Sequence, residues 1–322
     1  MEQPGHLLRG SAGVRFPWHI VAGFGAHLKA TKASLVITRN GHTDVVSLDE
    51  VDHLVLMGGH YLHTSVANTL LRSGKSLSFF EADGEPLGVL RPYGHQGTDA
   101  MREAQQAAPI HGYALKIAHG ALIHRIRTIE ILDQQSDQRI LYEGEIDIIR
   151  QNLSELQFLV RVDEIRRVHR LVSDMYYEII ARTVPAELGF RRRTSRPYTD
   201  VVNSILAVGY GMLFGNACAA AIGADLDPDT GFLHKGRAGL IYDLIEPFKT
   251  GMIDIPMLEL VRSGLEPRDY ECSTGRCILS QDLFSALTQI FHASIRQDIL
   301  DQQVFVVKEA LLNTDEFHVV KC

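Results

Sequence analysis

The chain changes its hydrophobic period once, and this change constrains its fold more than any other feature. Up to about Arg91, short β-branched runs are separated by turn signals such as Asn40-Gly41, a pair typical of tight hairpins. Beyond about residue 110, apolar residues recur at helical spacing. The pattern predicts an α+β protein with three parts: a small β-rich domain (1–91), a linker (92–110) and a larger, mainly α-helical domain (111–322).

Composition limits the class of protein. A chain of 322 residues with 45% hydrophobic content is long enough for two domains with buried cores. Four cysteines are too few for a disulfide framework, which favours a reducing cytoplasm, and Cys272 and Cys277 lack the two further ligands of a zinc site. No secretory leader and no apolar run of about 18 residues is apparent, so we expect a cytoplasmic protein without a membrane span.

The charge is distributed unevenly along the chain. The formal net charge is −7, which does not fit a protein that binds nucleic acid over its whole surface. Arginines nevertheless cluster, and local clusters of this kind favour a phosphate-binding patch. From the residues alone, a merely solvated helix surface is an equal alternative. The clusters are Arg161, Arg166, Arg167 and Arg170, then Arg182, Arg191, Arg192, Arg193 and Arg196.

One stretch, residues 231–249, combines a turn, a histidine and an amphipathic helix. Asp243 and Glu246 are three residues apart and therefore share a helix face, and His234 precedes them. Carboxylate oxygens together with an imidazole nitrogen suit a divalent ion such as Mn²⁺ or Mg²⁺. The alternative is a solvated helix face beside a loop histidine. The stretch is our candidate active site.

Two runs within this region, 225–234 and 243–249, carry a family resemblance. The first reads Asp-Leu-Asp-Pro-Asp-Thr-Gly-Phe-Leu-His and the second Asp-Leu-Ile-Glu-Pro-Phe-Lys. Together they resemble the signature of the CRISPR-associated adaptation endonuclease and integrase family, Cas one. The similarity covers nearly the whole chain and is strongest from about Val162 to Lys249. It implies a β-rich dimerisation domain joined to a helical catalytic domain.

The resemblance also implies roles for individual residues. His234 and Glu246 occupy positions of metal ligands, and Asp243 that of a further catalytic carboxylate. Asn203 and Tyr210 match positions near the family's site. Phosphate contacts are expected from surface cations, namely Arg191, Arg192, Arg193, Arg196, Lys235 and Arg237.

The sequence departs from the family at one metal position. Counting back from Tyr176, the family's glutamate position holds His169 and the following glycine position holds Arg170. A neutral imidazole is a competent ligand for Mn²⁺, so His169, His234 and Glu246 together still predict a metal site. Mn²⁺ is favoured and Mg²⁺ is possible but weaker, since Mg²⁺ prefers oxygen ligands. Arg170 would add positive charge if it pointed inward.

Two principal functions remain open at this stage. The first is a metal-dependent DNA endonuclease and integrase of CRISPR adaptation, which nicks DNA and joins spacer 3′-hydroxyls into the CRISPR array. Its expected partners are double-stranded and branched DNA, a second copy of the chain and the small ferredoxin-like adaptation protein Cas two. The second is a catalytically attenuated family member that serves as a DNA-binding assembly subunit, which the substitution at His169 favours. An integrase of a mobile element outside CRISPR is a further alternative.

Overall fold

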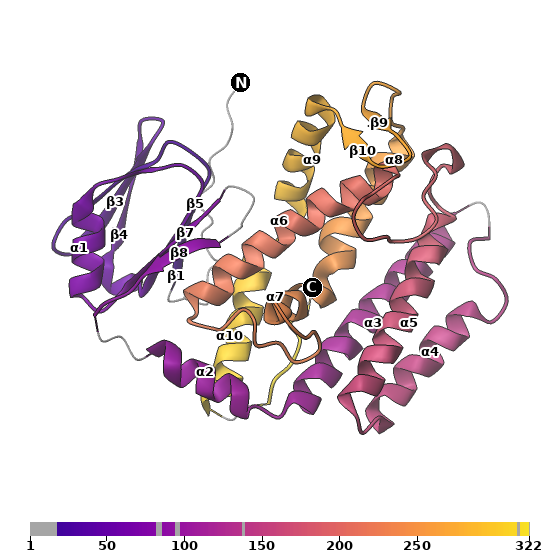
Figure 1. Cartoon of the computed structure of the whole chain (residues 1–322), viewed down its shortest axis with the longest axis horizontal. Coiled ribbons are helices and arrows are strands. Elements are labelled where there is room, and N and C mark those ends of the chain that lie inside the picture. The colour runs from indigo at the N-terminus through magenta and orange to yellow at the C-terminus, as the bar shows by residue number, and fades with distance from the viewer. Residues whose placement is uncertain (1–17, 82–85, 94–96, 137–138, 314–315, 322) are drawn as a thin grey trace.

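The computed structural model describes residues 18–81, 86–93, 97–136, 139–313 and 316–321. A strand-rich amino-terminal part stands beside a larger helical part, so the predicted α+β class is confirmed (Figure 1). The amino-terminal 17 residues of the predicted first domain lie outside the described residues.

The strand-rich part holds two four-stranded sheets. One has the order β1-β5-β7-β8, with β1, β5 and β7 parallel and β8 antiparallel. The other has the order β4-β3-β2-β6, and the α-helix α1 packs against β2 and β7. The elements are β1 (Trp18–Ala22), β2 (His27–Ala30), β3 (Ser34–Arg39), β4 (His42–Ser47), β5 (His53–Met57), β6 (Tyr61–Leu62), α1 (Thr64–Arg72), β7 (Ser76–Phe80) and β8 (Pro86–Leu90).

The hairpin predicted at Asn40-Gly41 is confirmed. Both residues have positive φ, 48° and 79°, and they join antiparallel β3 and β4. Glycine and asparagine tolerate this left-handed backbone better than other residues, which is why the pair forms a two-residue turn there.

The sheet that contains β1 contributes to two apolar cores, one on each face. Along β5, Leu54 and Leu56 face the second sheet, whereas Val55 and Met57 join the core of the helical part. Side chains alternate across a strand, so a sheet covered on both faces needs apolar residues at every position. The strand-rich and helical parts therefore share a core.

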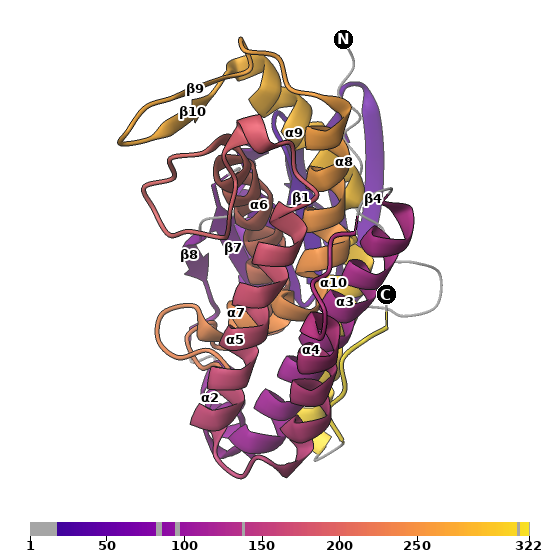
Figure 2. The same ribbon diagram turned by 90° about the vertical axis from the view of Figure 1, so that its right-hand side faces the viewer.

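Helices make up most of the remainder, and α3 and α5 lie side by side (Figure 2). The predicted linker contains α2, which is docked: Met101 is buried, and the Gln105 side-chain amide bonds to the backbone of Asp227. The elements are α2 (Gly97–Ala107), α3 (Ile110–Gln135), α4 (Glu145–Glu155), α5 (Val162–Ala181), α6 (Val201–Gly223), α7 (Gly239–Ile245), α8 (Ile255–Ser263), β9 (Tyr270–Cys272), β10 (Cys277–Leu279), α9 (Gln281–Ser294) and α10 (Gln297–Asn313).

Helix α6 corrects the expectation that the sequence contains no apolar run of about 18 residues. Over its 23 residues it is long and apolar enough to cross a membrane, with a mean hydropathy of 1.7 in its most apolar window. It is instead surrounded, because α7, α9 and α10 pack against it together with β1 and β5. Gly223 sits so close to Trp18 that an added Cβ would lie 2.8 Å from the Trp18 Cβ. A helix that is apolar on all sides is typical of a protein core as well as of a membrane.

Cys272 and Cys277 pair across the short β9–β10 hairpin and are joined by a disulfide. The small number of cysteines thus excluded a framework but not a single local bridge.

Candidate active site

The loop before α7 is folded around one carboxylate. Asp243 accepts hydrogen bonds from the backbone N–H groups of Phe232, Leu233 and His234, at 2.5, 3.1 and 2.8 Å. The loop closes tightly, since a Cβ on Gly231 would lie 2.4 Å from the carbonyl carbon of Gly239. The chain therefore curls back onto the start of α7, and this curl brings His234 beside the helix.

His234 is held through one of its two ring nitrogens. Its Nδ1 lies 2.8 Å from Asp243 Oδ1, whereas its Nε2 lies 3.9 Å from Glu246 Oε2. The carboxylate of Asp243 accepts a hydrogen bond from Nδ1, so this contact selects the tautomer whose Nε2 carries the lone pair. The His234 side chain is 31% exposed, so the ring is partly open to solvent.

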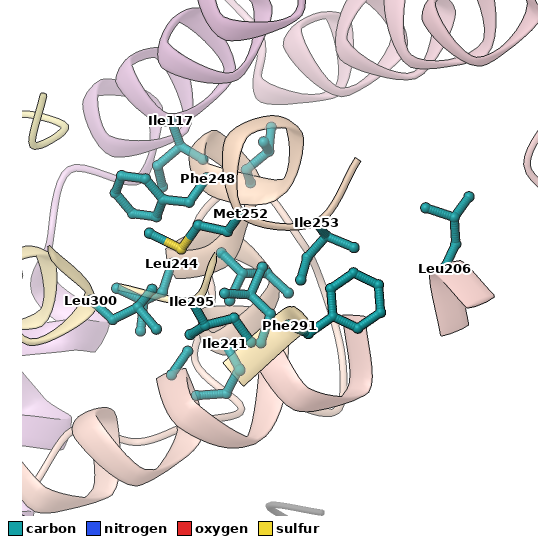
Figure 3. Packing of buried hydrophobic residues seen from close by; sticks show 14 of the residues in the cluster. Ile117, Leu206, Ile241, Leu244, Phe248, Met252, Ile253, Phe291, Ile295 and Leu300 are labelled. Atoms are coloured by element: carbon teal, nitrogen blue, oxygen red, sulfur yellow. The ribbon is translucent and has the colours of Figure 1, made fainter. Parts of the chain in front are cut away.

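Both carboxylates are buried, so the solvated-face alternative is wrong. Asp243 is 1% exposed and Glu246, in the short 3-10 helix that follows α7, is 3% exposed. Apolar residues of the segment 239–248 pack into the core, and the two carboxylates on the same segment are buried with them. Figure 3 shows this packing, in which Ile241, Leu244 and Phe248 meet Met252, Ile253, Phe291 and Ile295.

Helix α5 supplies His169, which the sequence analysis places at a glutamate position of the family pattern. His169 is buried, and its Nε2 lies 3.1 Å from Glu246 Oε1. Burial lowers the pKa of His169, which keeps the ring neutral at pH 7. One turn earlier, Arg166 donates to the carbonyls of Phe232 and Leu233 and so ties the loop to α5. Arg170 is exposed and adds no charge inside the site.

The charge inside the site comes from Arg125 on α3, which sequence reasoning missed. Its Nη2 donates to Glu246 Oε1, and its Nη1 lies 3.2 Å from His169 Nε2. Burial opposes the charged form of this guanidinium, but Glu246 outweighs it and the pKa of Arg125 is raised. A signal was present, because Arg125 falls on the stripe of buried residues of α3 between Ala121 and Ile129. An arginine on such a stripe needs a buried partner.

A second cation completes the surroundings of Glu246. Lys249 Nζ donates to Glu246 Oε2 at 2.5 Å. Burial alone would raise the pKa of Glu246, yet the charges of Lys249 and Arg125 and a hydrogen bond from His169 hold it well below its usual range. Glu246 is therefore ionised and is bound through both of its oxygens.

A buried network of tyrosines borders the cluster formed by Arg125, His169, Glu246 and Lys249. Tyr176 and Tyr210 donate to the two oxygens of Asp254, which lies in the π-helical turn Thr250–Asp254. Burial raises the pKa of Asp254 to about 6. The ring of Tyr210 lies under both Lys249 and Arg193. It therefore connects the cluster with residues 191–196, called here the arginine segment.

The predicted DNA-binding and supporting residues lie around this site rather than in it. Asn203 is fully buried and binds Arg193 through its side-chain oxygen at 2.8 Å, so it anchors the arginine segment. Lys235 lies on the loop before α7, and its Nζ is 3.2 Å from Oδ1 of Asp163 in the first turn of α5. Their contacts with DNA stay predictions. The exposed cations are Arg191, Arg192, Arg196, Lys235 and Arg237.

The predicted metal ligands converge, but their surroundings do not fit a divalent ion. Both oxygens of Glu246 are engaged by Arg125 and Lys249, and those of Asp243 by the loop and His234. Within the described ranges, no three histidine, cysteine, aspartate or glutamate side chains form a group able to hold a metal ion. Divalent ions need ligands whose charge is not already compensated.

Comparison with solved structures identifies the fold. A structure described as a partial Cas6-RT-Cas1–Cas2 complex superposes with a TM-score of 0.76 at 18% identity, covering 94% of this chain and 98% of that one. A casposase bound to integration product has a TM-score of 0.75 at 20% identity, over 93% and 96%. The chain therefore shares its fold with these two proteins.

Sequence comparison identifies the family. The family model described as CRISPR associated protein Cas1 matches residues 19–293. A protein of Methanospirillum hungatei called putative CRISPR-associated endonuclease Cas1 2 is 36% identical over 302 residues, which cover 94% of this chain and 100% of the relative. A Thermus thermophilus protein called CRISPR-associated endonuclease Cas1 1 is 28% identical over 85% of each chain. The chain belongs to the Cas1 family.

Proposed function

We propose that this protein binds DNA and acts on it as a nuclease and integrase of CRISPR adaptation. The observation that carries the proposal is the geometry of His234, whose side chain is partly exposed: its Nδ1 is held by buried Asp243, and its Nε2 lies 3.9 Å from Glu246 Oε2. The M. hungatei relative is called an endonuclease, and the casposase structure is described as bound to integration product. Both descriptions support DNA strand chemistry.

The residues present suggest how the reaction proceeds. His234 Nε2 takes the proton of the attacking hydroxyl, either water for nicking or a DNA 3′-hydroxyl for joining. The oxygen attacks phosphorus, the bond to the leaving oxygen breaks, and solvent protonates the leaving group. Asp243 keeps the ring in the required tautomer. The Mn²⁺ or Mg²⁺ dependence expected from the sequence stays a prediction that the present donor set does not support.

A second candidate function is that of a DNA-binding assembly subunit with an attenuated site. The observation that favours it is Arg125, which bonds both Glu246 and His169 and so engages two of the three predicted metal ligands. Under this proposal the arginine segment and the fold still organise DNA and partner proteins, while strand chemistry is performed elsewhere in the assembly.

The assembly we propose contains two copies of the chain, the small adaptation protein Cas2 and DNA, in the cytoplasm. A Cas2 partner is supported by the solved complexes that contain both proteins. A second copy is supported by β8, the edge strand of its sheet, whose apolar residues Leu87, Val89 and Leu90 are exposed. Exposed apolar edges favour pairing with another chain.

One assay separates the two candidate functions. Labelled spacer-length duplexes with free 3′-hydroxyls and a plasmid that carries a CRISPR array are incubated with the protein, with and without Cas2, in Mn²⁺, Mg²⁺ or chelator. We expect nicked and joined products on denaturing gels, and a dimeric mass by light scattering. DNA binding without products in any condition establishes the assembly subunit. If DNA is neither bound nor changed, both proposals are wrong.

DNA affinity should depend on the exposed arginines. Replacing Arg191, Arg192 and Arg196 with glutamine should flatten the slope of log affinity against log salt by about 0.9 for each phosphate that is no longer neutralised. Arg193→Gln is the comparison variant, because this side chain also holds Asn203 and should affect stability as well. Fluorescence anisotropy between 50 and 200 mM salt, about the range in which arginine–phosphate binding weakens, measures the slope. An unchanged slope in the triple variant would place the DNA elsewhere.

A further inference from the structure

We propose that the guanidinium of Arg125 is the resident cation of the Glu246 site and takes the place of a divalent metal ion there. The family resemblance leads one to expect a metal held by His169, His234 and Glu246. The contacts of His169 and Glu246 instead describe a site that already contains its positive charge.

The first argument is the occupation of Glu246. Its Oε1 accepts from Arg125 and its Oε2 from Lys249, so each oxygen already faces a full positive charge. The Lys249 side chain is 18% exposed and can turn to solvent, whereas the Arg125 side chain is 4% exposed and enclosed. Arg125 is therefore the cation that cannot leave without refolding of its surroundings.

The second argument is the hydrogen bonding of His169. Its Nε2 faces both Arg125 Nη1, at 3.2 Å, and Glu246 Oε1, at 3.1 Å. In one tautomer the Nε2 lone pair accepts from the guanidinium. In the other, Nε2 carries a hydrogen that it donates to the carboxylate. Neither tautomer leaves a lone pair at Nε2 for a metal ion.

The third argument is the charge balance. Arg125 and Lys249 bring two positive charges to the single carboxylate of Glu246. The two other buried carboxylates are bound by neutral donors, Asp243 by three backbone N–H groups and His234, and Asp254 by the hydroxyls of Tyr176 and Tyr210. A divalent ion would add two further positive charges without adding an anion, and buried like charges repel strongly.

Replacement of a glutamate by a histidine at position 169 fits this arrangement. A second carboxylate there would compete with Glu246 for Arg125, whereas a neutral ring accepts or donates one bond without adding charge. His169 is thus a positioning residue for Arg125 and Glu246 rather than a metal ligand.

The test is Mn²⁺ binding by the full-length chain at pH 7.5 without DNA, measured as loss of the free Mn²⁺ signal in electron paramagnetic resonance. We expect no stoichiometric site in the wild type or in Arg125→Lys. Arg125→Met should gain one site per chain, with affinity at least tenfold above the wild type, and adding His234→Ala should remove it. Arg150→Met is the matched control, because that arginine lies on the exposed face of α4 and pairs with Glu130.

Two results would overturn the inference. One is a stoichiometric Mn²⁺ site in the wild type that His234→Ala removes. The other is a folded Arg125→Met variant that binds no more Mn²⁺ than the wild type. Should Arg125→Met not fold, the wild-type titration and a folded Arg125→Gln variant decide between the same outcomes. DNA is absent from the measurement, so its result does not depend on the proposed nuclease or integrase activity.

Discussion

Glu246→Gln is expected to lower the free energy of unfolding by about 3–5 kcal/mol, the range found when one partner of a buried ion pair is removed. The amide keeps the shape of the side chain but not its charge, so the enclosed guanidinium of Arg125 loses its counterion. Lys249 is affected less because it reaches solvent. Urea unfolding followed by circular dichroism measures the change.

Glu130→Gln provides the matched control for this prediction. Glu130 also lies on α3 and pairs with an arginine, Arg150, at 2.7 Å, but the side chains of Glu130 and Arg150 are 36% and 54% exposed. Exposed pairs contribute about 0–1 kcal/mol, so this variant should unfold almost as the wild type does. Equal effects of the two substitutions would mean that Glu246 and Arg125 are not a buried pair in solution.

The second large effect is expected for Asp243→Asn, in the rate of DNA nicking or joining. The carboxylate accepts four hydrogen bonds, and an amide would turn its NH₂ group toward donors. Exchanging the carboxylate behind a catalytic histidine for an amide costs about 10⁴-fold elsewhere, because the histidine adopts the wrong tautomer. We therefore expect the initial rate to fall by about 10³–10⁴-fold. The free energy of unfolding should fall by about 2–3 kcal/mol.

Two measurements distinguish the tautomer effect from general damage. Imidazole ¹⁵N chemical shifts of His234 should show the hydrogen at Nδ1 in the wild type and a mixture in Asp243→Asn. Asp229→Asn is the control, because Asp229 also binds a backbone N–H of this loop, that of Ala238 at 2.7 Å, but does not contact the histidine. An Asp243→Asn variant that keeps more than about a tenth of the wild-type rate would contradict the role of His234 as the base.

Much of the fold was predictable because the signals are local. Alternating strands, the Asn40-Gly41 turn and the helical spacing after residue 110 each depend on neighbours in sequence, and the structure bears them out. The spacing of Asp243 and Glu246 was also predictive, since both enter one buried cluster. Their separate tasks were not predictable, because the partners of Asp243 come from the loop and those of Glu246 from other helices.

The missed part of the site depends on contacts between distant segments. Arg125 reaches Glu246 across 121 positions of the chain, and no local pattern specifies which helix will lie opposite the 3-10 helix that holds Glu246. The arginine on the buried stripe of α3 indicated that some acid would be required, without naming it. The same limit applies to α6, whose apolar residues predict burial but not whether protein or lipid surrounds them.

The sheet that carries apolar residues on both faces has a mechanical consequence. Trp18 of β1 packs on Gly223 of α6 and donates from its Nε1 to Asp301 of α10 at 3.0 Å, so the first strand is fastened to two helices of the other part. Rotation of one part against the other would expose this core to water. The free energy required would rise in proportion to the apolar area exposed. We therefore expect the two parts to move together, so that a displacement imposed at the β8 edge would reach α6 and the neighbouring α7 through the shared core.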